Sequence, residues 1–406
     1  MSELTKGQQL AVQGAVKDFY NGEKLIEIDG LAGTGKTHTA YQIFKELHLD
    51  MSQVLCMAYT GAASLVMRSR GMTNACTIHS ALYELVEVPD YNDIDNQFGI
   101  PRKHLEFKKR DYISPNIKVM FIDEASMVPK SMVEDIMSFG IPVIATGDLH
   151  QLPPVGDEPG FLTGSKVYHL TEIMRQAANN PIVYLANRVI EGLPIHNGTY
   201  GSVLVINNDE VLPQMYGYSD IVLSGTNRVR DAINMSIRQL AGFNSELPRY
   251  GERLICRQNN WNKCNEDNIS LVNGLIGTVI SNAETLEKYD KSKFNLDFLP
   301  DRSCVPFFRL KANYEYFVSN HEHRNAMKNM RVNYDRGEFF EYAYCITVHL
   351  SQGNEFSKGM YIENYVSRPQ MQQQLNYTAI TRFKDSMIYV RQKPKYYGFT
   401  QQNKKN

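Results

Sequence analysis

Short runs of apolar residues recur along the chain, and stretches with a helical spacing of apolar positions separate many of them. The runs are Leu25–Ile28, Val54–Met57, Lys118–Ile122, Val143–Ala145, Ile221–Leu223, Tyr344–Val348, Met360–Ile362 and Met387–Val390. Helical patterns lie between them, as at Thr37–Leu47 and Arg228–Leu240. Buried strands that alternate with helices are typical of parallel sheets covered on both faces. Because the runs fall before about residue 175 and after about residue 220, the pattern predicts an α/β fold with two domains.

Two stretches break this alternation. Residues 86–116 are charged and punctuated by proline and glycine, and we expect them to form a short hairpin inserted in the first domain. Residues 257–340 mix strand-like pieces with turn signals such as Asn273-Gly274, which predicts a compact β-rich insertion in the second domain. The expected boundaries are 1–177 for the first domain, 178–395 for the second and 396–406 for a flexible tail.

Composition narrows the class of protein only a little. Of the 406 residues, 43% are apolar and 21% charged, which is an ordinary globular mixture. The net charge of -1 does not by itself suggest a nucleic-acid partner, although a balanced sum can hide a basic groove. No run approaches the ~20 apolar residues of a membrane span, and Met1–Leu10 has no signal-peptide core. Since none of the six cysteines forms a C-x-x-C pair, we expect reduced thiols, no membrane partner and a cytoplasmic location.

The strongest local motif is GLAGTGKT at Gly30–Thr37, which follows a predicted strand and opens a predicted helix. Glycines at these positions let backbone N–H groups wrap around phosphates at the positive end of the helix. We expect Lys36 to reach the β- and γ-phosphates of ATP and the Thr37 hydroxyl to bind Mg²⁺. The expected nucleotide contacts here are Gly33, Thr34, Gly35, Lys36, Thr37 and Thr39.

Two further strand ends carry the polar groups that such a site needs. The apolar run before Asp123 and Glu124 predicts carboxylates at the end of a buried strand, where they are costly unless they meet a cation. We expect Asp123 to hold Mg²⁺ through water and Glu124 to activate the attacking water as a general base. Gln151 follows the next strand in the segment Gly147–Val155, and its amide can orient a water at the γ-phosphate.

Near the start of the chain, Thr5 and Gln8 have the spacing of a helix capping box. The Gln8 amide, which offers one donor and one acceptor group, could instead read the edge of adenine. Spacing alone does not separate these two interpretations, and both stay open.

Taken together, the order of the motifs resembles the RecD-like branch of the superfamily one helicases, which includes the compact Dda-like phage helicases. Besides the segments above, the resemblance is carried by Ala58–Ala63 (AYTGAA), Thr77–Ser80 (TIHS), Leu170–Gln176 (LTEIMRQ), Ile346–Phe356 (ITVHLSQGNEF) and Tyr377–Arg382 (YTAITR). It covers most of the chain except the two insertions.

The resemblance implies two RecA-like domains with ATP and Mg²⁺ between them and movement 5′ to 3′ along single-stranded DNA. It implies an arginine finger at Arg382, with Arg175 as a second candidate, and a nucleotide contact at Glu355. The residues that it places along the DNA track are Thr60, His79, Thr347, His349 and Ser351. Outside this context, the two histidines would be read as ordinary core or loop residues.

Two positions depart from the family pattern. Leu350 stands where the family usually has lysine before Ser-Gln-Gly, so one cationic DNA contact is missing or comes from elsewhere. Phe383 stands where the family usually has a small residue.

The predicted hairpin lies where the resemblance puts the DNA-facing side of the first domain. Phe98, beside Gly99 and Pro101, is the candidate for its tip. An aromatic side chain there could stack on the last base pair as a wedge, or it could pack the hairpin against the domain.

We therefore expect an ATP-dependent DNA helicase. The alternative is a DNA-stimulated translocase that displaces bound proteins with little unwinding; a phosphate-loop kinase or switch would not need the second α/β half. The expected partners are single-stranded and forked DNA, with a single-strand-binding protein or replisome component as a further possibility. We expect a monomer, located in the host cytoplasm if a phage encodes it.

Overall fold

The computed structural model describes residues 4–95, 100–164, 166–172, 179–267, 269–286, 290–301, 303–329 and 336–392. Three sequence predictions fall outside these ranges: the candidate hairpin tip Phe98, the second arginine candidate Arg175 and the tail at 396–406.

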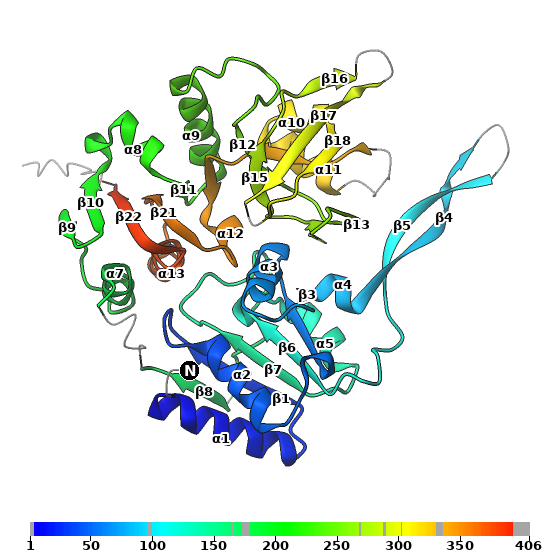
Figure 1. Ribbon diagram of the computed structural model, residues 1–406, viewed down its shortest axis with the longest axis vertical. Coiled ribbons are helices and arrows are strands. Elements are labelled where there is room, and N and C mark those ends of the chain that lie inside the picture. The colour runs from blue at the N-terminus through cyan, green and yellow to red at the C-terminus, as the bar shows by residue number, and fades with distance from the viewer. Residues whose placement is uncertain are drawn as a thin grey trace, which may run out of the picture.

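The first domain is built on a six-stranded parallel sheet with the order β3-β2-β6-β7-β1-β8 (Figure 1). Its strands are β1 (Leu25–Gly30), β2 (Val54–Ala58), β3 (Cys76–Thr77), β6 (Val119–Asp123), β7 (Val143–Gly147) and β8 (Val167–Leu170). The central strands β6 and β7 are buried along their whole length, because helices cover both faces of the sheet.

The helices of the first domain divide between the two faces of its sheet. One face packs against α1 (Lys6–Tyr20), α2 (Lys36–Glu46) and α3 (Gly61–Ser69), the other against α4 (Ile78–Leu82) and α5 (Lys130–Met137). Phe44 and Phe121 meet edge to face in the first of these cores, with ring centroids 5.3 Å apart. Among all the helices that the structure describes, none is long and apolar enough to cross a membrane.

The predicted insertion in the first domain is an antiparallel hairpin of β4 (Tyr83–Asp95) and β5 (Ile100–Lys109). It projects away from the domain, on the side where the β-rich insertion of the second domain lies (Figure 1). Its base is tied to α5, because Asp135 accepts a hydrogen bond from the Tyr83 hydroxyl at 2.6 Å and lies 3.0 Å from Lys109 Nζ.

The second domain has a six-stranded sheet with the order β20-β11-β21-β22-β10-β9, parallel except for β9 against β10. Its strands are β9 (Gly198–Tyr200), β10 (Val203–Asn207), β11 (Ile221–Ser224), β20 (Cys345–Thr347), β21 (Phe356–Ile362) and β22 (Phe383–Arg391). The expectation that its strands begin only after about residue 220 was wrong for β9 and β10. β9 is an edge strand of three residues, too short for a clear pattern. β10 lies between β22 and β9, and its apolar run Val203–Ile206 was left out of the sequence prediction.

Helices also cover both faces of the second sheet. One face packs against α7 (Pro181–Ile190) and α13 (Pro369–Ile380), and the other against α8 (Pro213–Tyr218) and α9 (Asn227–Leu240). A one-turn helix, α12 (Val348–Ser351), follows β20. The predicted arrangement of two parallel, helix-covered sheets is therefore present.

The second insertion is a subdomain around an antiparallel sheet with the order β16-β17-β15-β12-β19, in which β18 also pairs with β17. Its elements are β12 (Arg253–Cys256), β13 (Asn260–Cys264), β14 (Ser270–Leu271), β15 (Ile276–Val279), β16 (Glu284–Leu286), β17 (Asp290–Pro300), β18 (Phe307–Asn313), α10 (Tyr314–Val318), α11 (His321–Asn329) and β19 (Phe340–Tyr342). Its own core includes Phe294, Phe298 and Phe340, and Leu65 of α3 joins it from the first domain. The β-rich subdomain thus rests on both RecA-like halves.

Candidate functional site

Sheet order brings three of the predicted motifs to one edge. Because β6, β7 and β1 are neighbours and parallel, their carboxyl ends lie side by side. The GLAGTGKT loop follows β1, Asp123 ends β6, and the segment with Gln151 follows β7. Such an edge of a parallel sheet is the usual place for a ligand in α/β domains.

The phosphate loop has the backbone that its glycines make possible. Gly33 and Gly35 take left-handed φ angles of 83° and 77°, which side chains other than glycine disfavour. Lys36 Nζ bends back to the carbonyl oxygens of Gly30 and Leu31, at 2.6 and 3.2 Å. A phosphate of the right size could replace these carbonyl partners, so the cradle fits a nucleotide.

Two of the expected nucleotide contacts serve the loop itself. The side chains of Thr34 and Thr39 are fully buried, and their hydroxyls donate to Leu31 O at 2.8 Å and to Gly35 O at 3.1 Å. Their side chains therefore stabilise the loop and the first turn of α2, and neither residue lines the cavity, so the predicted nucleotide contact is not available to these side chains.

The two residues predicted to hold Mg²⁺ lie together. Thr37 Oγ1 is 3.3 Å from Asp123 Oδ2, while the other carboxylate oxygen of Asp123 accepts from Thr146 at 2.8 Å. A hydroxyl and a carboxylate oxygen are the donors that Mg²⁺ takes beside phosphates, so this pair fits the ion.

Glu124 is held in an unusual backbone conformation with φ of 52°, a region in which residues other than glycine are strained. Its Oε2 is buried without a hydrogen-bond partner. Burial raises the pKa of the Glu124 carboxyl; Arg382 opposes this effect and Asp123 adds to it. A buried carboxylate with a raised pKa and a free oxygen is suited to accept a proton from water.

The second domain delivers Arg382 to this edge. The starts of β21 and β22 pair through Phe356 and Phe383, so the residues just before them face the first domain. Arg382 Nη2 donates to Gln151 Oε1 at 3.3 Å, and its Nη1 lies 3.8 Å from Glu124 Oε1. The guanidinium is 5% exposed and belongs to the same cavity as the phosphate loop.

Arg70 is a cavity residue that the sequence motifs did not reveal. It caps the end of α3, and its guanidinium lies 2.5 Å from Glu355 Oε1 and 3.4 Å from Thr37 Oγ1. The other oxygen of Glu355 lies 2.6 Å from Lys384. Burial alone would raise the pKa of Glu355, but the charges of Arg70 and Lys384 together lower it below its usual value.

The contacts of Gln8 bear out the capping-box interpretation. Thr5 and Gln8 form the predicted capping box, with Thr5 N donating to Gln8 Oε1 at 3.0 Å. The amide nitrogen of Gln8 also donates to Thr34 O at 2.9 Å, so the side chain is tied to the phosphate loop. An adenine contact stays a prediction.

The nucleotide cavity has a volume of about 1030 Å³ and is lined by both domains. Further contacts join the domains beside it. Thr378 and Gln352, both from the second domain, bind the backbone N–H and C=O of Leu152 at 2.9 Å each. The residue next to Gln151 is thereby held on both sides by the opposite domain.

A separate groove of about 1130 Å³ crosses both domains and the β-rich subdomain. Thr60, Thr347 and His349, which the resemblance puts along a DNA track, line this one groove, and their contact with DNA stays a prediction. The two threonines cap α3 and α12 by accepting from backbone N–H groups, which leaves each hydroxyl hydrogen to be donated. Burial lowers the pKa of His349, which favours its neutral form. Leu350 lines the same groove and adds no charge.

The other two predicted DNA residues lie elsewhere. Ser351 is fully buried and its hydroxyl donates to Val348 O at 2.7 Å, so the expected DNA contact is not available to it. His79 does not line the groove. Its ring centroid lies 6.5 Å from that of Tyr59, which does line the groove. It packs at the base of the hairpin, 5.5 and 6.1 Å from the rings of Tyr83 and Phe107.

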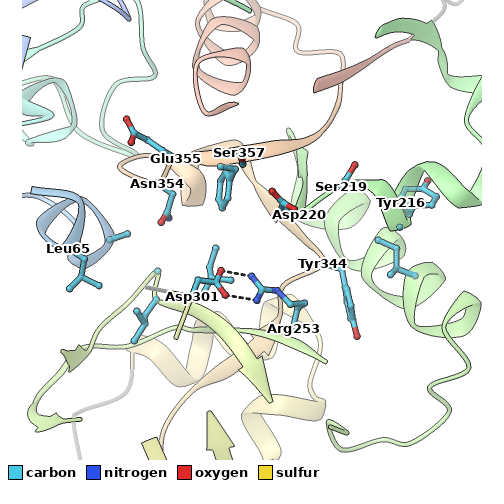
Figure 2. Close-up of a pocket in the computed structure, with 17 residues that line it drawn as sticks. Leu65, Tyr216, Ser219, Asp220, Arg253, Asp301, Tyr344, Asn354, Glu355 and Ser357 are labelled. Carbon is cyan, nitrogen blue, oxygen red and sulfur yellow. Dashed lines mark hydrogen bonds and ion pairs between the residues drawn. The ribbon is translucent and has the colours of Figure 1, made fainter. Parts of the chain in front are cut away.

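A third cavity of about 670 Å³ lies where the β-rich subdomain meets the second domain and α3 (Figure 2). Arg253 and Asp301 face each other across two contacts of 2.5 Å on its wall. Leu65 enters from α3, on the opposite side of the opening (Figure 2). This cavity holds none of the residues predicted for DNA.

Comparisons with known proteins agree with this arrangement. Residues 3–195 match the family of AAA domains. The chain is 24% identical over 407 aligned positions to the ATP-dependent RecD2 DNA helicase of Deinococcus radiodurans, covering 92% of this chain and 48% of that protein. It is 26% identical to the ATP-dependent DNA helicase dda of Enterobacteria phage T4, covering 58% of this chain and 57% of the relative. The chain thus spans about half the length of the curated relatives that it matches.

Solved structures show the same fold. A structure of two coordinating Pif1 helicases at forked double-stranded DNA aligns with a TM-score of 0.56 and 17% identity, over 96% of this chain and 92% of that one. Bacteroides Pif1 bound to single-stranded DNA aligns with a TM-score of 0.55 and 16% identity, over 96% and 93%. These likenesses confirm the predicted fold class, and the sequence relatives agree with the resemblance drawn from the motifs.

Proposed function

We propose that this chain, a relative of the RecD-like and Dda-like helicases of superfamily one, is an ATP-driven motor that moves 5′ to 3′ along single-stranded DNA and unwinds duplex. One observation carries the proposal. Arg382 of the second domain reaches Gln151 and Glu124 of the first, while a separate groove crosses the same two domains. Any movement of one domain relative to the other therefore changes the nucleotide site and the groove together.

The residues of the nucleotide site divide into those that hold ATP and its ion and those that act on the attacking water. When bound, ATP with Mg²⁺ supplies the phosphoanhydride whose hydrolysis provides the free energy. Lys36 and the loop N–H groups hold the phosphates, and Thr37 with Asp123 holds the ion. Gln151 orients the water, and Glu124 accepts its proton at the unpartnered Oε2.

Arg382 makes hydrolysis depend on the position of the second domain. A guanidinium beside the γ-phosphate stabilises the charge of the transition state, an effect worth a factor of about 10³–10⁵ in other phosphoryl-transfer enzymes. Closure of the domains completes the site, and product release lets them part. Arg175 stays the second candidate for this role.

The groove is the proposed path of the DNA strand. Hydroxyl and imidazole donors at Thr60, Thr347 and His349 suit contacts to phosphate and sugar, which carry no sequence preference. Thr60 belongs to the first domain and the other two to the second. If each domain grips the strand differently in the open and closed states, the ATP cycle becomes directed movement.

Forked DNA is the proposed substrate, and the hairpin of β4 and β5 is the proposed wedge. Pif1 helicases have been seen at forked DNA and dda is an ATP-dependent DNA helicase, which supports the assignment. The proposal also includes action as a monomer in the cytoplasm, where a single-strand-binding protein or replisome component is a candidate partner.

One experiment tests the function as a whole. ATPase activity is measured with and without single-stranded DNA, and unwinding is measured on duplexes with a 5′ or a 3′ tail. We expect strong stimulation and opening of the 5′-tailed duplex. Stimulation without unwinding would favour the translocase that displaces proteins, preference for the 3′ tail would contradict the polarity, and no stimulation would overturn the proposal.

A further inference from the structure

A single buried carboxylate in the β-rich subdomain is shared by four cations. Glu341 of β19 is 4% exposed and accepts a hydrogen bond from the Tyr316 hydroxyl at 2.6 Å. The cations around its two oxygens are Arg230 at 3.0 Å, Arg257 at 3.0 Å, Lys328 at 3.6 Å and Arg324 at 4.0 Å. We call these four side chains the cation cluster.

Positive charge exceeds negative charge in this cluster. Among the described residues, the further carboxylate paired with it is Asp231, which lies 2.7 Å from Arg230 and is 41% exposed. Four cations thus face two carboxylates, although the cationic side chains are only 3% to 25% exposed. Charges removed from water are costly unless an opposite charge meets them. The surplus indicates a place for an anion.

The pKa of Lys328 agrees with this surplus. Burial is the main cause that lowers the pKa of Lys328 to about 8, and the positive charges of Arg257 and Arg230 add to it. Glu341 acts in the opposite direction. The same cations hold the pKa of Glu341 far below its usual range despite burial. An arriving anion would relieve the repulsion and raise the pKa of Lys328.

Arg257 brings the cation cluster to the wall of the groove that we assign to DNA. Arg257 and His321 line this groove, as does Asn227 at the first turn of α9. The His321 Nε2 atom lies 2.9 and 3.0 Å from the amide nitrogens of Asn227 and Asn325. Since amide nitrogens only donate, Nε2 accepts, and the proton of the neutral ring is on Nδ1. The Nδ1–H group of His321 is thus left to donate beside the Arg257 guanidinium.

Arg257 is the member of the cluster that is placed to reach a ligand. Glu341 holds its Nε, and Asn273 Oδ1 lies 3.3 Å from its Nη1. A guanidinium has five N–H donors, so these two contacts orient it and leave further N–H groups to bind a ligand. Leu350, where the family pattern has a lysine, lines the same groove.

We propose that the cation cluster is a binding site for a phosphate of the single-stranded DNA backbone, and that Arg257 supplies the cationic contact that Leu350 cannot. Glu341 acts as a positioning residue for Arg257, and Lys328 adds charge through its proton. The proposal rests on the proposed function, because it identifies the ligand as the backbone of the same strand.

The first test measures binding of a fluorescent oligothymidylate to the full chain, without nucleotide, over a range of salt concentrations. Each phosphate contact on a single strand contributes about 0.7 to the slope of log K against log salt. We expect Arg257→Ala to weaken binding and to reduce the slope by about this amount, while Arg257→Lys retains most of it. An unchanged slope in a folded Arg257→Ala variant would overturn the proposal.

Arg253→Ala is the matched control. Arg253 lies four positions earlier in the same subdomain, but it pairs with Asp301 on the wall of the third cavity (Figure 2) and is not among the residues that line the DNA groove. The slope should stay at the wild-type value. An equal loss in both variants would mean that the effect is a general one of net charge or folding, which also counts against a phosphate site at Arg257.

The second test measures whether Lys328 takes up a proton when DNA binds. A purely structural role of Lys328 would give no such uptake. The charged and titratable groups that face Lys328 are Glu341, Arg257, Arg230 and His321, and the ring of Tyr316 lies 5.5 Å from its Nζ. Calorimetry of oligothymidylate binding at pH 8, in buffers of different ionisation enthalpy, should show uptake of a fraction of a proton. Lys328→Gln should remove most of this uptake, and heats that do not depend on the buffer would refute the site.

A final arm separates DNA from free phosphate. If inorganic phosphate alone, at constant ionic strength, gives the same proton uptake, the site is a general anion site and the DNA assignment fails. Failure of this proposal can be told from failure of the function: in the first case the wild type still binds oligothymidylate and hydrolyses ATP in response to it.

Discussion

Tyr377 of the second domain donates its hydroxyl hydrogen to Asp148 of the first across 2.6 Å. The same oxygen accepts from the backbone N–H of Ala32, in the phosphate loop, at 2.9 Å. The side chain is 1% exposed, and burial together with Asp148 raises its pKa well above the usual value, so it remains a donor. One hydroxyl therefore joins the phosphate loop, the segment after β7 and the far domain.

This bridge predicts that Tyr377→Phe weakens communication between the domains. The ring still fills its buried place, but Asp148 and the Ala32 N–H lose a partner, a loss worth about 1–3 kcal/mol when the groups stay buried. We expect DNA-stimulated turnover to fall about tenfold or more, as about 1.4 kcal/mol corresponds to a factor of ten, with nucleotide binding retained.

Tyr361→Phe is the control for this change. Tyr361 is also a fully buried tyrosine, but its hydroxyl donates to Asn376 within the second domain, at 2.7 Å. It should reduce the melting temperature to a similar degree and leave the stimulation by DNA near the wild-type ratio. Equal stimulation in the two variants would show that the bridge does not couple the sites.

A second prediction concerns Lys36. In the described part of the chain, its ammonium group donates hydrogen bonds to two carbonyl oxygens of its own loop. Lys36 also lines the nucleotide cavity. Lys36→Ala should therefore abolish ATP hydrolysis without unfolding the domain. Lys45→Ala, on the exposed last turn of α2, should keep full activity. A folded Lys36→Ala protein with normal turnover would exclude this loop as the phosphate site.

A third prediction separates catalysis from binding at Arg382. Arg382→Ala should bind nucleotide yet lose a factor of about 10³ or more in turnover. Because Arg382 is buried and also bonds to Thr378 O, Arg382→Lys serves as a second variant that keeps the charge but loses the planar donor fork. We expect it to remain folded and to stay slow. A loss of less than tenfold in both would direct attention to Arg175.

The sequence was informative about the fold at most of the strands that are buried on both faces. Runs such as Val143–Ala145 are apolar throughout, and all eight predicted runs lie at strands of the two parallel sheets. The edge strands β8 and β9 were not predicted, because a short strand with one open side needs no continuous apolar run. β10 was missed although Val203–Ile206 is apolar and the strand lies between β22 and β9. Its place comes from pairing with β22, which is distant in the sequence.

For the candidate site, local motifs predicted the groups that one sheet edge assembles, such as Thr37 beside Asp123. They did not predict contacts that depend on the docking of two domains. Arg70 and Tyr377 have no spacing that would indicate the atoms they meet. The opposite error occurred at Ser351, which a motif placed on the DNA track although its hydroxyl closes a turn of α12.

The last prediction concerns the hairpin as a wedge. Its two strands are both anchored to α5 through Asp135, which binds Tyr83 of β4 and Lys109 of β5. A wedge works only if it stays rigid while the strand is pulled, because opening one base-pair step costs ~1.4 kcal/mol. Asp135→Ala should loosen the anchor and slow unwinding severalfold, while ATPase stimulated by single-stranded DNA remains unchanged.

Phe98→Ala tests the proposed tip in the same assays. Stacking of an aromatic side chain on a base contributes ~1–3 kcal/mol, comparable to the cost of opening a step, so its loss should also slow unwinding alone. Glu134→Ala, an exposed neighbour of Asp135 on α5, is the control and should behave as the wild type. Unwinding that is unaffected in both Asp135→Ala and Phe98→Ala would reject the wedge. Parallel loss of unwinding and ATPase would instead mean that the hairpin supports the packing of the first domain, since His79 and Phe107 meet at its base.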